Sequence, residues 1–145
     1  PKIVWPDIKP QPLFFYDDSG CIVKGNCYWI ILKDRQREDL LFLIQGVANT
    51  KLMTQYHDLV FNNKLYAGRR RYLSQYVEKY PLPDPQSQSA QRIISLVKEL
   101  VFHTPAQAAR KQKEVEIEVA LADAFGVEPL VSQKNHSEEE SVAYR

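Results

Sequence analysis

The sequence has little of what catalytic and metal sites are usually built from. Of its 145 residues two are cysteine, three are histidine and five are glycine, and the glycines stand apart from one another. A structural zinc site needs more Cys or His ligands, at closer spacing than Cys21 and Cys27 offer, and a phosphate-binding loop needs clustered glycines. We therefore expect no metal site, no nucleotide-binding loop, and the reduced, buried cysteines that are usual in a cytosolic protein.

Long hydrophobic runs are also missing. The longest, Tyr28 to Leu32, has the length of a buried strand and is far short of the roughly 20 apolar residues that span a membrane. With 44% hydrophobic and 26% charged residues, the composition is that of one soluble globular domain. The chain begins with Pro1 and shows no basic-then-apolar leader, so we expect a cytoplasmic location and a piece of a longer protein.

The hydrophobic period changes once, at Asp34. Residues 2–33 consist of short apolar runs separated by prolines and by Ser19-Gly20, which is typical of strands, and apolar residues then recur at helical spacing. We predict an α+β fold, a small antiparallel or mixed sheet packed with three to four helices. The predicted strands are 2–5, the hairpin-forming pair 12–18 and 21–32, and an edge strand at 75–82; the predicted helices are 37–60 with a break at Asn49-Thr50, 86–102 and 106–125.

The domain is predicted to end near residue 130. Residues 131–145 are highly charged and show no hydrophobic period, so we expect a disordered tail there.

Tyr76 and Tyr80, in the predicted edge strand at 75–82, are expected on a half-buried strand surface.

Charge is distributed unevenly. Between Lys51 and Tyr76 five cationic side chains stand against Asp58 alone, a local charge of +4 in a chain whose net charge is +1. Arg and Lys neutralise phosphates, and Asn, Gln and Arg can form bidentate hydrogen bonds with purine edges. The mixture indicates nucleic-acid binding, although a solvated loop or ion pairs with the acidic last helix would also explain it. The cations are Lys51, Lys64, Arg69, Arg70 and Arg71; the interleaved polar and aromatic residues are Asn62, Asn63, Tyr66, Tyr72 and Gln75.

Catalytic constellations are poorly represented. A metal-dependent nuclease needs Pro-Asp followed by an acid and a lysine on the neighbouring strand, and Pro6-Asp7 and Pro83-Asp84 offer only the first half. No nucleophile elbow is present either. We therefore expect no catalysis from this chain alone.

Five segments of the sequence form a pattern through their order. They are the entry strand "PKIVWPDI", the strand pair "FFYDDSGCIVKGNCYWIIL", the broken helix pair "EDLLFLIQGVANTKLMTQYHDLVF", the strand "YVEKYPLPDP" and the final amphipathic helix "KEVEIEVALADAFGVEP". In this order they resemble a known family, the TaqI-like C-terminal specificity domain of adenine-specific DNA methyltransferases, which also occurs in bifunctional restriction-modification enzymes. The resemblance covers about residues 1–130 of this sequence. The family usually has Asn-Ser where this chain has Asn49-Thr50.

The resemblance implies a target-recognition domain that binds double-stranded DNA. An N-terminal methyltransferase domain of the same chain would bind S-adenosylmethionine and methylate an adenine flipped out of the duplex. The "NPPY"-type motif and the S-adenosylmethionine loop are absent from this sequence, so the fragment itself is expected to be inactive. Whether the parent chain also carries a restriction endonuclease stays open.

The resemblance also assigns roles to the basic segment. Lys51 and Lys64 would bind phosphates, and one or two of the three arginines would reach guanine edges. Asn62 and Asn63 would bind adenine edges, and Tyr66 or Tyr72 a phosphate or a thymine methyl group.

A second class of function is a protein-interaction or scaffold domain of a restriction or phage-defence complex. In that case the arginines would pair with acidic residues of a partner subunit. Salt distinguishes the two, because phosphate binding weakens steeply with salt and apolar docking does not.

Overall fold

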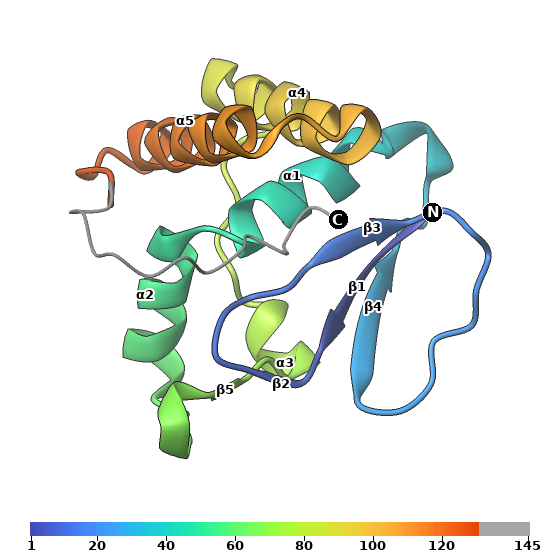
Figure 1. The fold of residues 1–145 in the computed structure, drawn as a ribbon, viewed down its shortest axis with the longest axis vertical. Coiled ribbons are helices and arrows are strands. Elements are labelled where there is room, and N and C mark those ends of the chain that lie inside the picture. Colours follow the sequence, from blue (N-terminus) through green and yellow to red (C-terminus); the bar gives the residue numbers. More distant parts are fainter. Residues whose placement is uncertain (131–145) are drawn as a thin grey trace.

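The structure is a computed structural model that describes residues 1–130; residues 131–145, where a tail is predicted, lie outside the described part. Its α+β class is confirmed (Figure 1). None of the helices within residues 1–130 is both long and apolar enough to cross a bilayer. The elements are β1 (Lys2–Pro6), β2 (Ile8–Lys9), β3 (Phe15–Asp17), β4 (Cys27–Ile31), η1 (Arg35–Arg37), α1 (Asp39–Ala48), α2 (Lys51–Phe61), η2 (Tyr66–Gly68), β5 (Arg70–Arg71), α3 (Ser74–Val77), α4 (Gln88–His103) and α5 (Gln107–Phe125).

The main sheet is antiparallel with the order β3-β1-β4. Ile3 of β1 pairs with Tyr16 of β3 on one side and with Ile30 of β4 on the other. The predicted hairpin between the second and third strands is therefore wrong. The physical reason is that Ile3, Val4 and Trp5 are all buried, so both faces and both edges of β1 need neighbours.

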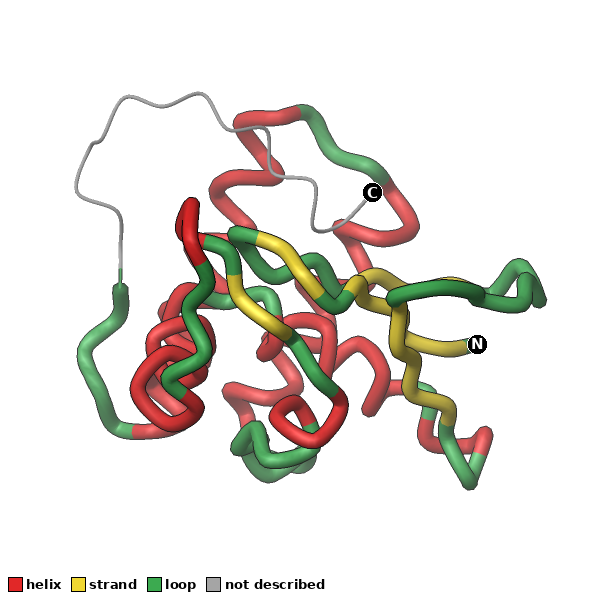
Figure 2. Tube along the Cα trace, turned by 90° about the horizontal axis from the view of Figure 1, so that it is seen from below, coloured by secondary structure: helices red, strands yellow, loops and turns green. Residues whose placement is uncertain are grey.

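The chain between β3 and β4 is a long loop rather than the start of a strand. Figure 2 shows this loop projecting from the sheet, beside the N-terminus. Gly20 and Gly25 both have positive φ, which a continuous strand does not allow. Cys21 lies in this loop and is exposed, and Cys27 is half-buried, so the prediction that both cysteines are buried is wrong.

The predicted edge strand at 75–82 is also wrong. Residues 74–77 form the single turn α3, and the next turn continues with Tyr80 N–H donating to Val77 O at 3.0 Å. Helical turns direct Val77 into the core, where it is 6% exposed. Pro81 and Pro83 have no N–H to donate to a sheet.

The break between α1 and α2 falls at Asn49-Thr50, as predicted. Thr50 is the N-cap of α2, and its Oγ1 accepts a hydrogen bond from Met53 N at 3.1 Å. The Asn49 side chain turns away from the helix to bind the backbone of Phe14, accepting from its N–H at 2.9 Å and donating to its C=O at 2.7 Å. Asn49 thereby ties the helix pair to the entrance of β3.

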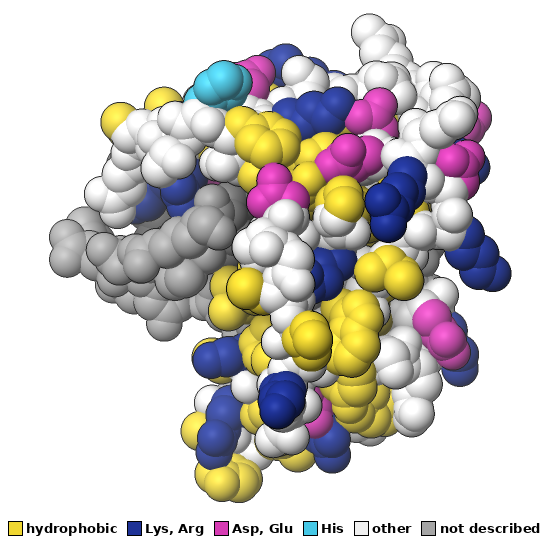
Figure 3. Space-filling view, turned by 90° about the vertical axis from the view of Figure 1, so that its right-hand side faces the viewer, with side chains coloured by type: hydrophobic (Ala, Val, Ile, Leu, Met, Phe, Trp, Pro, Cys, Tyr) yellow, Lys and Arg dark blue, Asp and Glu magenta, His cyan; other side chains and the backbone are white. Residues whose placement is uncertain are grey.

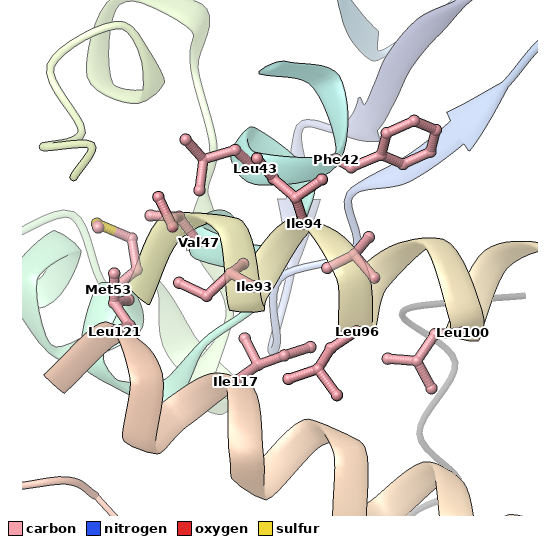
Figure 4. Close-up of a cluster of buried hydrophobic side chains, with 12 residues drawn as sticks. Phe42, Leu43, Val47, Met53, Ile93, Ile94, Leu96, Leu100, Ile117 and Leu121 are labelled. Atoms are coloured by element: carbon pink, nitrogen blue, oxygen red, sulfur yellow. The ribbon is translucent and has the colours of Figure 1, made fainter. Parts of the chain in front are cut away.

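Two hydrophobic clusters form the core. In the larger cluster α1, α4 and α5 pack together with the start of α2, and Figure 4 shows Val47, Ile93 and Ile117 converging from three helices. In the smaller cluster the inner face of the sheet, with Ile3 and Trp5, packs against Leu41 and Tyr72. The lower end of the molecule in Figure 1 includes α2, η2, β5 and β2, away from α4 and α5.

Candidate nucleic-acid interface

The basic segment forms a short hairpin at the lower end of the molecule, which we call the basic loop (residues 62–71). It begins where α2 ends, at Asn62, whose φ of 43° is left-handed. Leu65 N donates to Arg69 O at 2.7 Å and closes the hairpin. The tip turns through Ala67 and Gly68, with φ of 59° and 67°. The strand that leaves it, β5, pairs antiparallel with β2, so the loop is attached to both a helix and a strand.

Arg70 is bound on its helix side by Asp58 of α2. Its Nε lies 2.6 Å from Asp58 Oδ1 and its Nη2 lies 2.9 Å from Oδ2, a bidentate pair. Lys64 Nζ lies 3.3 Å from the same carboxylate, and Arg70 Nη1 also donates to Pro10 O. The hydrogen bond from Arg70 lowers the pKa of Asp58, so this carboxylate stays ionised. The guanidinium of Arg70 is therefore largely used within the fold.

Arg71 is bound on its strand side by Asp7. Its Nε lies 3.1 Å from Asp7 Oδ1 and its Nη2 lies 2.6 Å from Oδ2. Asp7 is only 6% exposed, and its carbonyl oxygen accepts from Tyr72 N at 2.6 Å. The two contacts lock β5 in register with β2. Asp7, which with Pro6 offers half of a nuclease motif in the sequence, is thus the counter-ion of Arg71.

A buried histidine of α2 binds the backbone at the end of the basic loop. His57 is 0% exposed, with Nε2 3.0 Å from Arg71 O and Nδ1 2.7 Å from the Tyr80 hydroxyl. These partners assign the neutral tautomer in which Nε2–H donates and Nδ1 accepts. Burial lowers the pKa of His57. Asn63 Nδ2 donates to the same Arg71 carbonyl at 2.8 Å, so this network holds the backbone where the loop ends.

The outer face of the basic loop is cationic and aromatic. Tyr66 is 81% exposed, and the guanidinium carbon of Arg69 lies 4.7 Å from the centre of its ring, a cation–π contact. The Lys64 side chain is 58% exposed, and Lys9 on β2 is also exposed. Figure 3 shows Lys and Arg side chains gathered with hydrophobic ones at the lower end of the molecule. Asp58 and Asp7 balance the two arginines that they bind, which leaves Lys64, Arg69 and Lys9 as surplus positive charge.

The predicted contact residues thus fall into three groups. Asn62, Lys64 and Tyr66 are exposed on the basic loop, and the half-buried Arg69 contacts Tyr66. Asn63, Arg70 and Arg71 lie in the same loop but bind other parts of the fold. Tyr72 and Lys51 are separate from them: Tyr72 is 2% exposed, and Lys51 lies at the opposite end of α2, about 16 Å of helix away.

Sequence reasoning missed the residues that support the loop. Asp58 enters the sequence analysis only as the single charge that opposes five cations, and neither His57 nor Lys9 is predicted there to belong to the site. The only signal for them is that His57 and Asp58 lie about one turn before the end of α2, on the way into the basic segment. Within residues 1–130 no group of three or more His, Cys, Asp or Glu side chains could hold a metal ion.

Comparison with known proteins relates this chain to part of a larger enzyme. Over 130 residues it is 55% identical to the type II methyltransferase M.BanIII of Aneurinibacillus aneurinilyticus. The match covers 90% of this chain and 22% of that protein, so the chain spans about a fifth of the length of the relative. No family model matches the chain. The chain is therefore related in sequence to a segment of a type II methyltransferase.

Proposed function

We propose that the chain is the DNA target-recognition part, residues 1–130, of an adenine-specific DNA methyltransferase of a restriction-modification system. The observation that carries the proposal is the contact of the exposed Tyr66 with the half-buried Arg69, together with the surplus positive charge on a loop that ion pairs hold in place. Similarity to a segment of a type II methyltransferase supports the same class, as does the resemblance to TaqI-like specificity domains.

The methyl transfer itself would belong to an N-terminal domain of the parent chain, in the cytoplasm. S-adenosylmethionine would be bound there. The residues of this chain do not fit that cofactor, because neither its glycine-rich loop nor an Asn/Asp-Pro-Pro-aromatic sequence occurs in them. What this chain would contribute is orientation of the duplex, so that the target adenine can be flipped towards the catalytic domain.

Phosphates and bases would be bound by different side chains of the basic loop. Lys64 and Lys9 would bind phosphates near the loop and set the register of the duplex, since contacts of this kind carry no sequence information. Lys51 would bind a phosphate about 16 Å away, at the other end of α2. Asn62 is exposed at the loop entrance, where its amide would be able to reach an adenine edge. The buried side chain of Tyr72 is left out of this contact surface.

Binding to DNA at increasing salt tests the proposal. The purified chain is titrated against a fluorescent duplex of random sequence, with binding followed by anisotropy between 50 and 300 mM salt. The logarithm of the binding constant should fall linearly with the logarithm of salt, with a slope of about −0.9 for each phosphate contact. Lys64→Ala should weaken binding to all sequences and flatten the slope by about one unit.

The matched control is Lys111→Ala, which removes an exposed lysine of α5 at the opposite end of the molecule and should leave the slope unchanged. Absence of binding at 50 mM salt, or binding that salt does not weaken, would contradict the proposal.

A second candidate function is the protein-interaction or scaffold role. The observation that favours it is the outward face of the sheet, where Trp29 is 52% and Ile31 66% exposed, together with the 88% exposed Ile22 of the projecting loop. Docking through this apolar surface would depend little on salt. A partner subunit that binds with the same strength at 50 and 300 mM salt, and that Trp29→Ser releases, would support this role.

A further inference from the structure

Among the three consecutive arginines, the structure assigns the reading of a base to Arg69, and we propose that it recognises a guanine in the major groove while stacked on Tyr66. This inference rests on the proposed function of the basic loop. Composition alone made the three arginines equivalent candidates.

The first step is how each guanidinium is used. Arg70 and Arg71 each present two nitrogen atoms to one carboxylate, Asp58 and Asp7 respectively. A fork of two donors is also what an arginine uses to bind O6 and N7 of guanine. Arg70 also donates from Nη1 to Pro10 O, so all three of its guanidinium nitrogens are used within the fold. Arg71 keeps Nη1, but the Nε–Nη2 edge of its guanidinium is bound to Asp7.

The second step is that Arg69 has kept its donors. Within residues 1–130 no carboxylate forms an ion pair with it, and its buried Nε has no hydrogen-bond partner. Because Nε is buried, a base would be bound through the two terminal nitrogens of Arg69, which no carboxylate of the described residues occupies.

The third step is the orientation of Arg69. The guanidinium carbon of Arg69 lies over the Tyr66 ring, 4.7 Å from its centre, a distance at which the planar group can stack on the ring. All N–H groups of a guanidinium lie in its plane, so stacking on the face leaves the edges to hydrogen-bond. Stacking also restricts the rotamers of a long side chain, which lowers the entropy lost on binding a base.

The fourth step is the rigidity of the backbone that carries Arg69. The Leu65–Arg69 hydrogen bond closes the hairpin, and the next two residues are fixed to α2 and to β2 by the carboxylates just described. Ala67 at the tip holds a left-handed conformation, which is unfavourable for a residue with a Cβ and is kept by the contacts on either side of it. Arg70 and Arg71 are thus positioning residues that present Arg69.

The test is a selection from a pool of random-sequence duplexes at a fixed, near-physiological salt concentration, with the bound duplexes sequenced. The chain should enrich a motif that contains a guanine. Arg69→Ala and Arg69→Lys should both lose discrimination at one position by about 5- to 150-fold, while their binding to the unselected pool falls only a few-fold. Tyr66→Phe, which keeps the stack, should retain the motif, and Tyr66→Ser should weaken it.

Arg37→Ala, which removes an exposed arginine of η1, is the matched control, and unchanged melting temperatures show that each variant folds. If Arg69→Ala selects the same motif with the same discrimination, or if the unmodified chain binds the pool with a steep salt dependence but selects no motif, Arg69 is not the reader although DNA binding stands. If the unmodified chain does not bind the pool at all, the proposed function fails as well, and the inference fails with it.

Discussion

Individual side chains of the basic loop differ in whether the fold already uses their hydrogen-bonding groups. Arg70 and Arg71 contact carboxylates, Asn63 contacts the backbone, and Tyr66 and Arg69 contact each other at the surface. At the residue scale, stability and recognition should therefore be separable by single substitutions.

Arg70→Ala should lower the stability of the fold. The Arg70 and Asp58 side chains are each 16% exposed, and the substitution leaves the half-buried carboxylate with Lys64 alone. We expect a loss of about 1–2 kcal/mol in the free energy of unfolding, between the values for exposed and buried pairs. Urea denaturation measures it, with Arg37→Ala, expected to change stability by less than about 0.5 kcal/mol, as the control. Equal stability of the two variants would show that the Asp58 pair does not hold the loop.

His57 should make the stability of the fold depend on pH. Its pKa in the folded chain lies below the ordinary value of 6.5 because the ring is buried, with Tyr80, Asp58 and Arg70 the polar groups around it. Below about pH 6.5 the unfolded chain then binds more protons than the folded chain. The contribution of His57 to the free energy of unfolding is therefore fully present above about pH 6.5 and is lost as the pH falls through the folded pKa. Melting temperatures from pH 8 to 5 test this: His57→Gln should flatten the curve relative to the unmodified chain, whereas His103→Gln, at an exposed position, should not. Curves that stay parallel in His57→Gln would rule out this role.

At the scale of elements, the contact between α1 and α4 depends on a glycine. A Cβ at Gly46 would lie 2.6 Å from Ile93 Cγ2 and 2.8 Å from Val97 Cγ2. Both are β-branched side chains, whose rotamers are restricted in a helix. The absence of a side chain at Gly46 is therefore what lets the two helices approach.

Gly46→Ala should destabilise the protein although alanine is the better helix former. Overpacking costs about 1–3 kcal/mol and exceeds the gain in helix propensity of about 1 kcal/mol. Thermal or urea unfolding measures the net loss, with the exposed Ser95→Ala of α4 as a control that should be neutral or slightly stabilising. A more stable Gly46→Ala variant would mean that α4 can move away at little cost.

The elements that the sequence predicts well are those with local causes. The long helices follow from apolar residues at helical spacing, and the Asn49-Thr50 break follows from a capping residue beside a residue that suits a turn. Strand order could not be predicted in the same way, because β1 pairs with two segments that lie at different distances along the chain. Residues 74–77 are helical and a turn follows them, because Val77 contacts the core and Tyr80 contacts His57, and no local pattern in the sequence records these contacts.

For the candidate site, the sequence predicts the segment but not the roles within it. The excess of positive charge is local and visible in the sequence. Which arginine is bound within the fold depends in part on Asp7, which lies 64 positions away from Arg71 in the chain. Asn63 and Tyr72 are polar or aromatic like their neighbours, and only the fold shows that one binds the backbone and the other is buried.

At the scale of the whole molecule, DNA would bind, on the proposed function, at the lower end of the fold, away from the helical layer of α4 and α5. The chain has a net charge of only +1, so binding should be confined to the end where positive charge is in surplus. The apolar outer face of the sheet would remain available to another protein surface. Recognition and partner docking would then occur on separate faces.

The most direct test of this central claim is to map the bound duplex on the chain by NMR. Backbone amide shifts of the isotope-labelled protein are recorded as random-sequence duplex is added at low salt. We expect the largest changes on residues 62–71 and Lys9, with a smaller set near Lys51 and its partner Glu118, and no change at the amides of β4 and of the start of α5. Shifts centred on the Trp29–Ile31 face, or an absence of any localised change at saturating duplex, would contradict it.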